Sequence, residues 1–522
     1  MNRREFLRLG AMAGAGLSLP GCVSISARYT KPRKLVRREE SLLVHNASLV
    51  DVRAGEVVPG QSLLLQRGKI AAIWPVAQAR MISADREVDL GGSYLVPGLI
   101  NAHCHLTLPC GMGFSLGFVS SMERQAERNA EECVKHGVTT VRDMLSPLNW
   151  MTTLQDKIQH GQITGPRILS SAAVQVRGGY CRHLGVLSSA RYWHDANNPS
   201  EAREAVKKAV DASAGALKLF QQPCELFLPE EPLPLMDVPT MAAVCDEAAR
   251  FGRSVALHHV GLDGLRRGLA AGVCSFEHLA TDGELSEQDL AALLSRKAHV
   301  VPTLSVPFAL AYQQKGDPNW GKGQTLEIAA GRRARMGKLL AEYCEPEIHA
   351  QGLRSLAKLS DPRNFDNPPD RFYLAPRLFV QAAARGQANL LALHRAGIAL
   401  GAGNDGGAPL LFPGAMALEL EMMERSGIPG KDVLRSATLE NARLLGMEDR
   451  LGSLEEGKIA DLVVLEKNPL ETVAHLETVR MVFLDGELVF DRAAGALMAR
   501  GDVPRSSGLA DRGSAQPPIG KG

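Results

Sequence analysis

The chain has 522 residues, of which 45% are hydrophobic and 22% are charged, a composition typical of a globular protein with a large core. Lysine and arginine (59) nearly balance aspartate and glutamate (57), so the net charge of +2 offers no basic excess for binding nucleic acid. No stretch approaches 18 consecutive apolar residues, which excludes a protein that crosses the membrane many times. We therefore expect an enzyme-sized chain of about three ordinary domains, or fewer if one of them is a barrel.

Residues 1–27 have the pattern of an export signal and not of a folded domain. The pair Arg3-Arg4 precedes Phe-Leu and a weakly apolar stretch, and residues 19–22 read Leu-Pro-Gly-Cys. The twin arginines resemble a Tat signal, and Leu-Pro-Gly-Cys resembles a lipobox in which Cys22 carries the lipid. This predicts Tat export to the periplasm or cell surface, with membrane contact only through a lipid anchor on Cys22. Two alternatives are an ordinary amphipathic helix and cleavage near Ala27 without lipid.

Segments rich in β-forming residues stand near both ends of the chain, between Gly and Pro residues. These segments are 41–46, 61–74, 460–465 and 480–490. They predict a small β-sandwich domain built from both chain ends, comprising residues 41–94 and 447–495. Residues 500–522 are rich in Gly, Pro, Ser and charge, so we expect a disordered tail.

The middle of the chain, residues 95–446, alternates short apolar strands with helical stretches. The expected strands are 95–105, 138–143, 167–174, 216–220, 254–258, 275–278, 299–304 and 398–403. Helices are expected between them, for example at 201–212 and 242–251. Eight strand–helix alternations predict an α/β fold, a (β/α)8 TIM barrel. The interval 305–397 is much longer than one helix, so we expect an inserted helical region that forms a lid.

Polar residues stand at the predicted carboxyl ends of these strands, where barrel enzymes carry their catalytic groups. In chain order they are His103, His105, Lys218, His258, His278 and Asp405. Positions i and i+2 of a strand face the same side, so His103 and His105 can point together into the barrel mouth. A lone His-x-His pair usually holds no metal, but four further polar residues at separate strand ends favour a metal site. Arg142 and Asp143, at the end of the second strand, are expected to pair with each other or to touch substrate.

The sequence around these residues resembles the amidohydrolase superfamily of metal-dependent hydrolases. Residues 96–105 are similar to its first-strand motif Pro-Gly-Leu-Ile-Asp-x-His-x-His, with Asn101 in place of Asp. Residues 401–405 are similar to the Gly-Thr-Asp of its eighth strand, with Asn404 in place of Thr or Ser. The other similar segments are 137–143, 215–219, 255–258, 275–278, 437–442 and 451–462. The resemblance covers residues 41–490 and is greatest to the imidazolonepropionase-related and prolidase-like group.

The resemblance implies two divalent metal ions, expected to be Zn²⁺, bridged by a carboxylated lysine. The implied ligands are His103, His105 and Asp405 for one ion, and His258 and His278 for the other. Lys218, carboxylated by CO₂, would be the bridge. Imidazole and carboxylate ligands suit zinc, and a bridging carboxylate offsets the charge of two close dications. The alternative for Lys218 is a lysine in a salt bridge.

This site predicts hydrolysis of amide or peptide C–N bonds in small molecules, such as dipeptides or N-acyl amino acids. A metal-activated hydroxide would attack the carbonyl carbon. Asp405 would take the proton and pass it to the leaving nitrogen. The expected partner is a small-molecule substrate without nucleic acid, and homo-oligomer formation stays open.

Two other functions remain open. A cyclic amidohydrolase, lactonase or deaminase of the same superfamily would use a related site, but deaminase relatives typically use one metal and lack the lysine found here at Lys218. A non-catalytic binding lipoprotein would keep the barrel without the chemistry. The complete ligand set weighs against it, because a decayed site should have lost at least one ligand.

Candidate substrate-binding residues follow the third predicted strand. Tyr180 or His183 could donate a hydrogen bond to the oxyanion formed during hydrolysis. Arg177 and Arg182 could bind a substrate carboxylate. All four could equally be loop residues in solvent.

Overall fold

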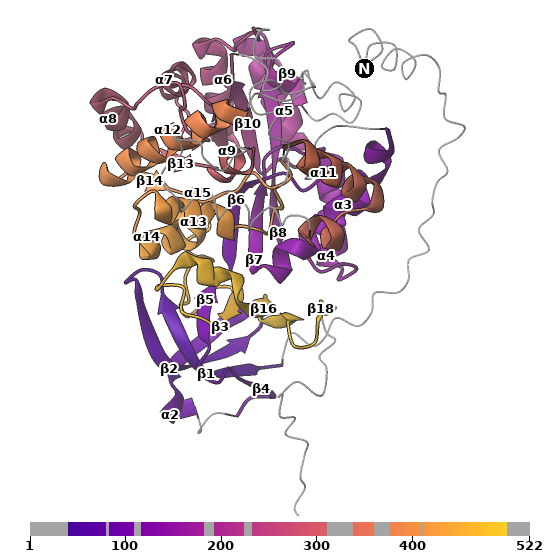
Figure 1. The fold of residues 1–522 in the computed structure, drawn as a ribbon, viewed down its shortest axis with the longest axis vertical. Helices are drawn as coiled ribbons and strands as arrows, with labels where there is room; N and C mark the ends of the chain where they lie inside the picture. Colours follow the sequence, from indigo (N-terminus) through magenta and orange to yellow (C-terminus); the bar gives the residue numbers. More distant parts are fainter. Residues whose placement is uncertain are drawn as a thin grey trace, which may run out of the picture.

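The computed structural model describes residues 40–79, 83–108, 116–181, 193–223, 232–310, 338–359, 376–408 and 411–497. The predicted signal with Cys22, the tail at 500–522, and the loop residues Arg182 and His183 lie outside these ranges. Two nine-stranded sheets form the framework of the described part, one at the lower end of the view in Figure 1 and one in the middle of the molecule. No helix within these ranges has the length and apolar character needed to span a bilayer.

Strands from the two chain ends form the first sheet, called the end sheet below. From the N-terminal side it takes β1 (Leu42–Asp51), β2 (Glu56–Gln66), β3 (Lys69–Pro75), β4 (Arg86–Asp89) and β5 (Tyr94–Pro97). From the C-terminal side it takes β15 (Leu462–Leu465), β16 (Val479–Leu484), β17 (Glu487–Asp491) and β18 (Ala496–Leu497). Antiparallel pairing of β5 with β15 joins the two halves. Both ends therefore share one sheet, while the sandwich arrangement and the domain boundaries stay predictions.

The end sheet forms because its apolar residues alternate with more exposed ones. Leu63 and Leu65, two positions apart on β2, are both buried and share an apolar cluster with Leu95 and Phe483 from the other strands. The link from β2 to β3 passes through two residues with positive φ, one of them Gly68, and this geometry is favoured in a tight hairpin.

The second sheet is parallel and lies in the middle of the molecule. Its order is β14-β13-β12-β11-β10-β8-β7-β6, with β9 (Trp193–Asp195) beside β8. The strands are β6 (Leu99–Cys104), β7 (Val138–Asp143), β8 (Arg167–Gln175), β10 (Ala216–Gln221), β11 (Ser254–His259), β12 (Ser275–Glu277), β13 (His299–Val301) and β14 (Ala399–Leu400). Each of the eight predicted strand positions therefore holds a strand, and the last one is shorter than expected.

The first predicted strand, 95–105, is two strands that belong to different sheets. β5 pairs with β15 in the end sheet, whereas β6 pairs with β7 in the parallel sheet. The break falls at Gly98, where a Cβ atom would lie 2.1 Å from Thr139 Oγ1. Only glycine leaves room for the Thr139 side chain at this point, where the chain passes from one sheet into the other.

Backbone hydrogen bonds tie β6 to the segment that follows β14, so the parallel sheet is curled. Ala102 N donates to Ala402 O (3.0 Å), and Asp405 N donates to His103 O (2.9 Å). The Asn441 side chain reinforces this edge, because its amide donates to Ala402 O (2.7 Å) and accepts from Ala402 N (3.0 Å). The two ends of the sheet order thus lie side by side.

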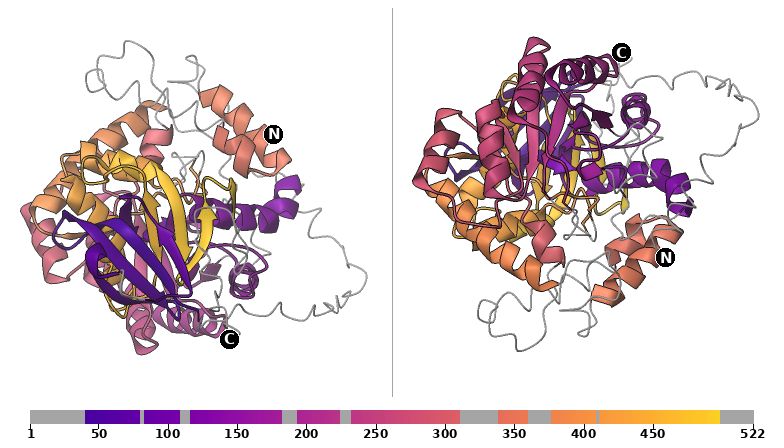
Figure 2. Two further views of the ribbon diagram at one scale, coloured as in Figure 1. Left: turned by 90° about the horizontal axis from the view of Figure 1, so that it is seen from below. Right: turned by 90° about the horizontal axis from the view of Figure 1, so that it is seen from above.

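Helices lie on the outer side of the parallel sheet (Figures 1 and 2). They are α3 (Leu116–Lys135), α4 (Leu148–Gln159), α5 (Pro199–Asp211), α6 (Val238–Arg250), α7 (Leu262–Ala271), α8 (Glu287–Ser295), α13 (Ala417–Arg425), α14 (Gly430–Arg435) and α15 (Asn441–Leu444). The helices predicted at 201–212 and 242–251 are α5 and α6, and both begin earlier than expected. Asn198 and Asp237 cap these two starts, and a proline follows within two residues.

The described parts of the predicted insertion are helical. They contain α9 (Ser305–Leu310), α11 (Pro346–Leu359) and α12 (Pro376–Arg395). α12 contacts α9, α13 and β14, so this helix covers the end of the sheet order next to the last strand. A lid role for residues 305–397 stays a prediction.

Candidate metal centre

The structure brings the six predicted site residues into one cluster at the carboxyl ends of the parallel strands. Three of them lie within strands and three directly follow a strand or its extension. They are His103 on β6, Lys218 on β10, His258 on β11, His105 after β6, His278 after β12, and Asp405 after β14. The parallel register brings these ends together, although the residues are separated by up to about 300 positions in the chain.

Asp405 lies between the two histidines of the His-x-His motif. Its Oδ1 atom is 2.8 Å from His105 Nε2 and 3.4 Å from His103 Nε2. The Lys218 amine completes this side of the cluster, with Nζ 3.1 Å from His103 Nε2. Four potential ligand groups therefore point at one small volume.

The other two histidines face each other across the cluster. His258 Nδ1 lies 2.8 Å from His278 Nε2, and the two rings meet edge to face. The ring centroid of His278 is 4.9 Å from that of His103, which links the two halves of the cluster. One ligand atom each from His103, His278 and Asp405 lies within 4.8 Å of the others, a spacing at which a metal ion could be held.

Three of the histidines use their second ring nitrogen to bind a neighbouring side chain. The pairs are His103 Nδ1 with Glu277 Oε2 (2.7 Å), His258 Nε2 with Gln222 Oε1 (2.7 Å), and His278 Nδ1 with Thr303 Oγ1 (2.6 Å). A carboxylate only accepts, so the His103 Nδ1–H donates to it and leaves a lone pair on Nε2 inside the cluster. Such outer partners fix the orientation of histidines that bind metal.

Arg142 pairs with Glu277 and not with Asp143, so the expected pair of neighbours was wrong. Arg142 Nη2 donates to Glu277 Oε1 (2.7 Å), and both side chains are fully buried. Asp143 instead accepts hydrogen bonds from Leu106 N (2.7 Å) and Ser146 Oγ (2.9 Å). Adjacent residues of a strand point to opposite faces, which is why these two side chains have different partners.

Burial keeps His103, His258 and His278 neutral. It lowers the pKa of His103 to about 4, and it holds the pKa values of His258 and His278 well below their usual range. Asp405 behaves in the opposite way: burial alone would raise its pKa, but His103 and the hydrogen bond from His105 hold that pKa well below its usual range. At neutral pH these three neutral imidazoles and the Asp405 carboxylate are in the forms that bind divalent metals.

Lys218 is buried without an anionic partner. Lys218 is only 1% exposed, and no carboxylate in the described chain forms an ion pair with it. The salt-bridge alternative therefore has no counterpart among the described residues. Burial lowers the pKa of Lys218 to about 8, so the uncharged amine, although still the minor form near neutral pH, is far more populated than in an exposed lysine. A neutral amine is the form that reacts with CO₂.

Three non-glycine residues at these strand ends have backbone angles in the left-handed region. The φ angles are 72° at His278, 48° at Thr303 and 52° at Asp405. Such a conformation costs about 1–3 kcal/mol per residue and persists only where the surroundings enforce it. Because three such strained residues lie together at the cluster, tertiary contacts must hold the backbone of these strand ends in place.

The described substrate candidates divide into one residue at the cluster and one at the surface. The Tyr180 ring stacks on Phe220 (centroids 5.3 Å apart) and contacts the His258 ring (4.5 Å). Arg177 has a side chain that is 76% exposed and lies 4.0 Å from Asp195. Tyr180 is thus placed to reach a molecule bound at the cluster.

The sequence analysis overlooked the residues that orient the histidines. These are Glu277, Gln222 and Thr303; Arg142, which lies behind Glu277, was named but expected to have another partner. Glu277 stands inside the Phe-Glu-His segment already recognised as a motif, and Gln222 and Thr303 are polar residues just past strands. Their positions at strand ends were the available signal, since this is where barrel enzymes gather functional side chains.

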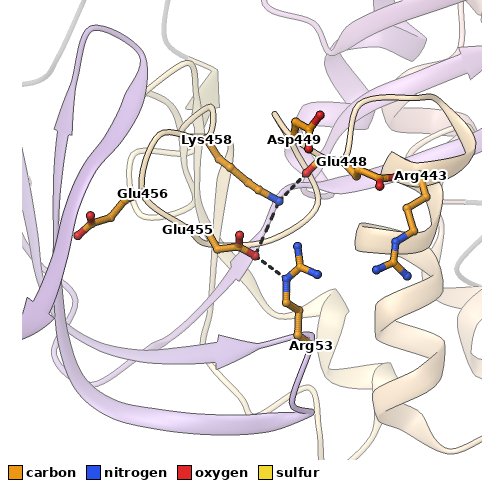
Figure 3. A pocket seen from close by; sticks show the side chains of 7 residues that line it. All are labelled: Arg53, Arg443, Glu448, Asp449, Glu455, Glu456 and Lys458. Atoms are coloured by element: carbon orange, nitrogen blue, oxygen red, sulfur yellow. Dashed lines mark hydrogen bonds and ion pairs between the residues drawn. The ribbon is translucent and has the colours of Figure 1, made fainter.

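A separate cavity of about 260 Å³ lies between the end sheet and α15, away from the histidine cluster (Figure 3). Its lining is charged throughout, by Arg53, Arg443, Glu448, Asp449, Glu455, Glu456 and Lys458. Arg53 Nε lies 2.6 Å from Glu455 Oε1, and Lys458 Nζ donates to Glu448 O (2.6 Å). The first bond joins the turn between β1 and β2 to the segment after α15, and the second lies within that segment, so both hold the cavity walls together.

A curled parallel sheet with histidine, lysine and aspartate side chains gathered at its carboxyl end is an arrangement of α/β enzymes that hold metal ions at the strand ends. Residues 94–489 match the amidohydrolase family. This match spans most of the chain, so the protein belongs to that family. Family membership supports a hydrolase that acts on carbon–nitrogen bonds.

Several known proteins share this fold over most of the chain. A solved Xaa-Pro dipeptidase is 23% identical and covers 86% of this chain and 100% of its own, with a TM-score of 0.65. The ochratoxinase of Aspergillus niger is 22% identical over 474 residues, covering 82% of this chain and 83% of the ochratoxinase. A solved structure of A. niger ochratoxinase superposes with a TM-score of 0.64 at 20% identity, covering 87% of this chain and 96% of its own. At these identities the structural likeness shows the shared fold.

Adenine deaminases match only a short stretch. Adenine deaminase 3 of Rhizobium meliloti is 32% identical over 105 residues, which is 20% of this chain and 16% of the deaminase. The chain thus spans much less than two thirds of the length of this relative in the match.

Proposed function

We propose that the protein is an exported, metal-dependent amidohydrolase that cleaves amide or peptide C–N bonds of small molecules. Its substrates are dipeptides or N-acyl amino acids, and its parallel strands close into an eight-stranded barrel. The observation that carries this proposal is the convergence of six ligand-type side chains at one strand edge. Three of the histidines in that set have their outer nitrogen already bound by a polar neighbour.

The donor set fits two divalent ions, for which Zn²⁺ is the best candidate. His258 Nδ1 and His278 Nε2 face each other at 2.8 Å while their outer nitrogens are bound, which is an arrangement suited to sharing one ion. The proposed ligands are His103, His105 and Asp405 for the first ion, and His258 and His278 for the second. Carboxylated Lys218 would hold both ions, and its burial without an anionic partner among the described residues supports this role.

The metal ions, when bound, would polarise the substrate carbonyl and lower the pKa of the attacking water. Asp405 accepts the proton of that water and passes it to the leaving nitrogen, so one carboxylate serves as base and then as acid. His105, 2.8 Å from the Asp405 carboxylate, holds it in place for this transfer. Tyr180, next to His258, donates a hydrogen bond to the oxygen that becomes negatively charged.

The substrate class draws support from the structural relatives. The Xaa-Pro dipeptidase acts on dipeptides by its name, and it shares 86% of this chain in fold. Deamination is the second candidate, favoured by the short matches to adenine deaminases. Buried Lys218 distinguishes the two, since deaminase relatives of this superfamily lack a lysine at this strand.

The N-terminal sequence supports the proposed location. Residues 1–27 carry the twin-arginine and Leu-Pro-Gly-Cys patterns, so we place the mature protein outside the cytoplasm, attached to a membrane through lipid on Cys22. A membrane-fraction assay of wild type against Cys22→Ala tests this, because loss of the lipid should release the protein.

Metal content tests the proposed function most directly. Purified wild type should contain about two divalent ions per chain by mass spectrometry, and Lys218→Ala about one or none. Lys458→Ala is the matched control, because Lys458 is also a buried lysine but lies in the cavity away from the cluster. Hydrolysis of a panel of dipeptides and N-acyl amino acids should follow the metal content.

Other outcomes assign the protein elsewhere. One ion in both wild type and Lys218→Ala would favour a deaminase or cyclic amidohydrolase with a single metal. No ion in wild type, even after incubation with zinc and bicarbonate, would contradict the proposal and leave a non-catalytic binding lipoprotein.

A further inference from the structure

Glu419 on α13 is a buried carboxylate that stands behind the cluster. It is fully buried, and no basic side chain in the described ranges forms an ion pair with it. Its two oxygens accept hydrogen bonds from the segment after β13: Oε1 from Leu304 N (2.9 Å), and Oε2 from Ser305 N (2.7 Å) and Ser305 Oγ (2.8 Å). All the bonds that hold this carboxylate therefore come from one turn at a strand end.

That turn contacts one proposed ligand directly and the residue next to another. Thr303, the residue before Leu304, lies 2.6 Å from His278 Nδ1 through its hydroxyl. Ser305 Oγ also lies 2.9 Å from the carbonyl oxygen of Asn404, the residue before Asp405. Because His278 and Asp405 are assigned to different ions, this turn is shared by both halves of the site.

Thr303 and Asp405 are both in the left-handed backbone region, which a non-glycine residue adopts only when held there. Glu419 binds the residues that directly follow Thr303, so it constrains the turn that contains the strained threonine. Two backbone N–H groups pointing the same way need two acceptor oxygens, and a carboxylate is the side chain that offers both. This explains why the position holds a glutamate even though no cation in the described ranges compensates its burial.

We propose that Glu419 is the positioning residue that sets the orientations of His278 and Asp405 toward their metal ions. It acts through the 303–305 turn: one path runs through Thr303 to the His278 ring, the other through Ser305 to the Asn404 carbonyl and the Asp405 backbone. The inference rests on the proposed function, because it assigns metal ions to these two residues.

Substitutions at Glu419 separate positioning from general stability. Glu419→Ala removes every bond to the turn. Glu419→Gln keeps the shape and one acceptor oxygen but presents an amide N–H₂ to the second backbone N–H, so it should be an intermediate case. Asp289→Asn is the control, because Asp289 is also a buried carboxylate that caps a helix start, at α8, through Ser286, and it contacts none of the six cluster residues.

The readouts are zinc affinity, by competition with a chromophoric chelator, and the visible absorption spectrum of the protein loaded with Co²⁺. Glu419→Ala should bind zinc up to about 10-fold more weakly and shift the cobalt bands, an effect no larger than the loss of a direct outer partner of a metal ligand, because Glu419 acts through the turn. Glu419→Gln should show a smaller shift in the same direction. Asp289→Asn should lower the unfolding temperature and leave affinity and spectrum unchanged.

Two results would overturn the inference, and they are distinguishable. If Glu419→Gln and Glu419→Ala lose thermal stability as the control does but keep wild-type affinity and spectrum, Glu419 has only a structural role while the metal site stands. If wild type itself binds neither zinc nor cobalt, the proposed function fails and the inference fails with it. Should Glu419→Ala not fold, Glu419→Gln alone decides between the first result and the expected one.

Discussion

The buried ion pair between Arg142 and Glu277 allows a quantitative test of how the cluster is held. Glu277 accepts from Arg142 Nη2 (2.7 Å) and Ser275 Oγ (2.6 Å) on one oxygen, and it faces His103 Nδ1 (2.7 Å) with the other. Arg142 also donates through Nε to Ala102 O (2.6 Å). We consider the variants Glu277→Gln, Arg142→Met and the two combined.

Both side chains are fully buried, so removing one charge leaves the other without compensation. Each single substitution should therefore destabilise the fold by about 3–5 kcal/mol, the cost of an uncompensated buried charge. The double variant removes both charges and should lose about as much as one single variant, not the sum of two. The expected coupling energy is then about 3–5 kcal/mol, the cost of one single variant, and larger than for neighbours in ordinary contact.

The assay is urea unfolding of the metal-free protein at pH 7, followed by tryptophan fluorescence, with chelator present so that metal affinity does not contribute. The control cycle uses the ion pair between Arg266 and Asp289. The Arg266 guanidinium is half exposed, so the coupling energy of this pair should be about 1 kcal/mol or less. Additive effects of Glu277→Gln and Arg142→Met, within about 0.5 kcal/mol, would refute the assignment of a coupled buried pair.

The same cycle has a defined pH dependence. Burial alone would raise the pKa of Glu277, but the Arg142 guanidinium and the His103 hydrogen bond hold that pKa well below its usual range. A carboxylate with a depressed pKa stabilises the fold above the pKa of the unfolded chain, about 4.3, and that contribution is lost as pH falls below it. The coupling should thus be constant between pH 6 and 8 and decline only in acid.

Three further predictions concern single residues near the cluster. Thr303→Val removes the hydroxyl beside His278 Nδ1 and should weaken zinc binding about 10-fold in a chelator competition, with little change in the unfolding temperature. Burial raises the pKa of Glu419 to about 7, so the free energy of unfolding should fall as pH rises from about 4.5 to 7. Between pH 5 and pH 8 the loss measured by urea unfolding should be up to ~3 kcal/mol, and Glu419→Gln should remove this pH dependence. Asn101→Asp places an acceptor where the amide now donates to Asn404 Oδ1 (2.8 Å) and should lower stability by about 1–3 kcal/mol in the same assay; an unchanged value would show that the amide bond is dispensable.

The parts of the fold that could be predicted are those with a local signal. Short apolar strands followed by helices gave the parallel sheet, and each predicted strand position holds one. The six polar residues at strand ends converge because parallel strands bring their carboxyl ends to one edge. Pattern and order along the chain are sufficient for this, since the sheet itself supplies the three-dimensional arrangement.

The contacts that orient these side chains depend on information that is absent from local patterns. Glu277 meets Arg142 across the interior of the curled sheet, so this pair depends on how β7 and β12 face each other. The expected pairing of Arg142 with Asp143 failed because neighbours on a strand face opposite ways. Likewise, the split of the first strand at Gly98 is set by the close approach of Thr139, which lies 41 positions further on in the chain.

Asn101 and Asn404, the two departures from the family's usual residues, are one structural unit. Asn101 donates to Asn404 Oδ1 (2.8 Å) and accepts from His103 N (3.1 Å), while Asn404 Oδ1 also accepts from Gly406 N (2.9 Å). Each asparagine thus holds the backbone beside a proposed ligand, His103 or Asp405, and the bond between them ties the first strand to the last. An amide supplies the donor that a carboxylate at position 101 would lack, so the second asparagine gains a partner only because the first is also present. In the sequence the two changes are separate departures from the family motifs, whereas in the fold the two side chains are bonded to each other.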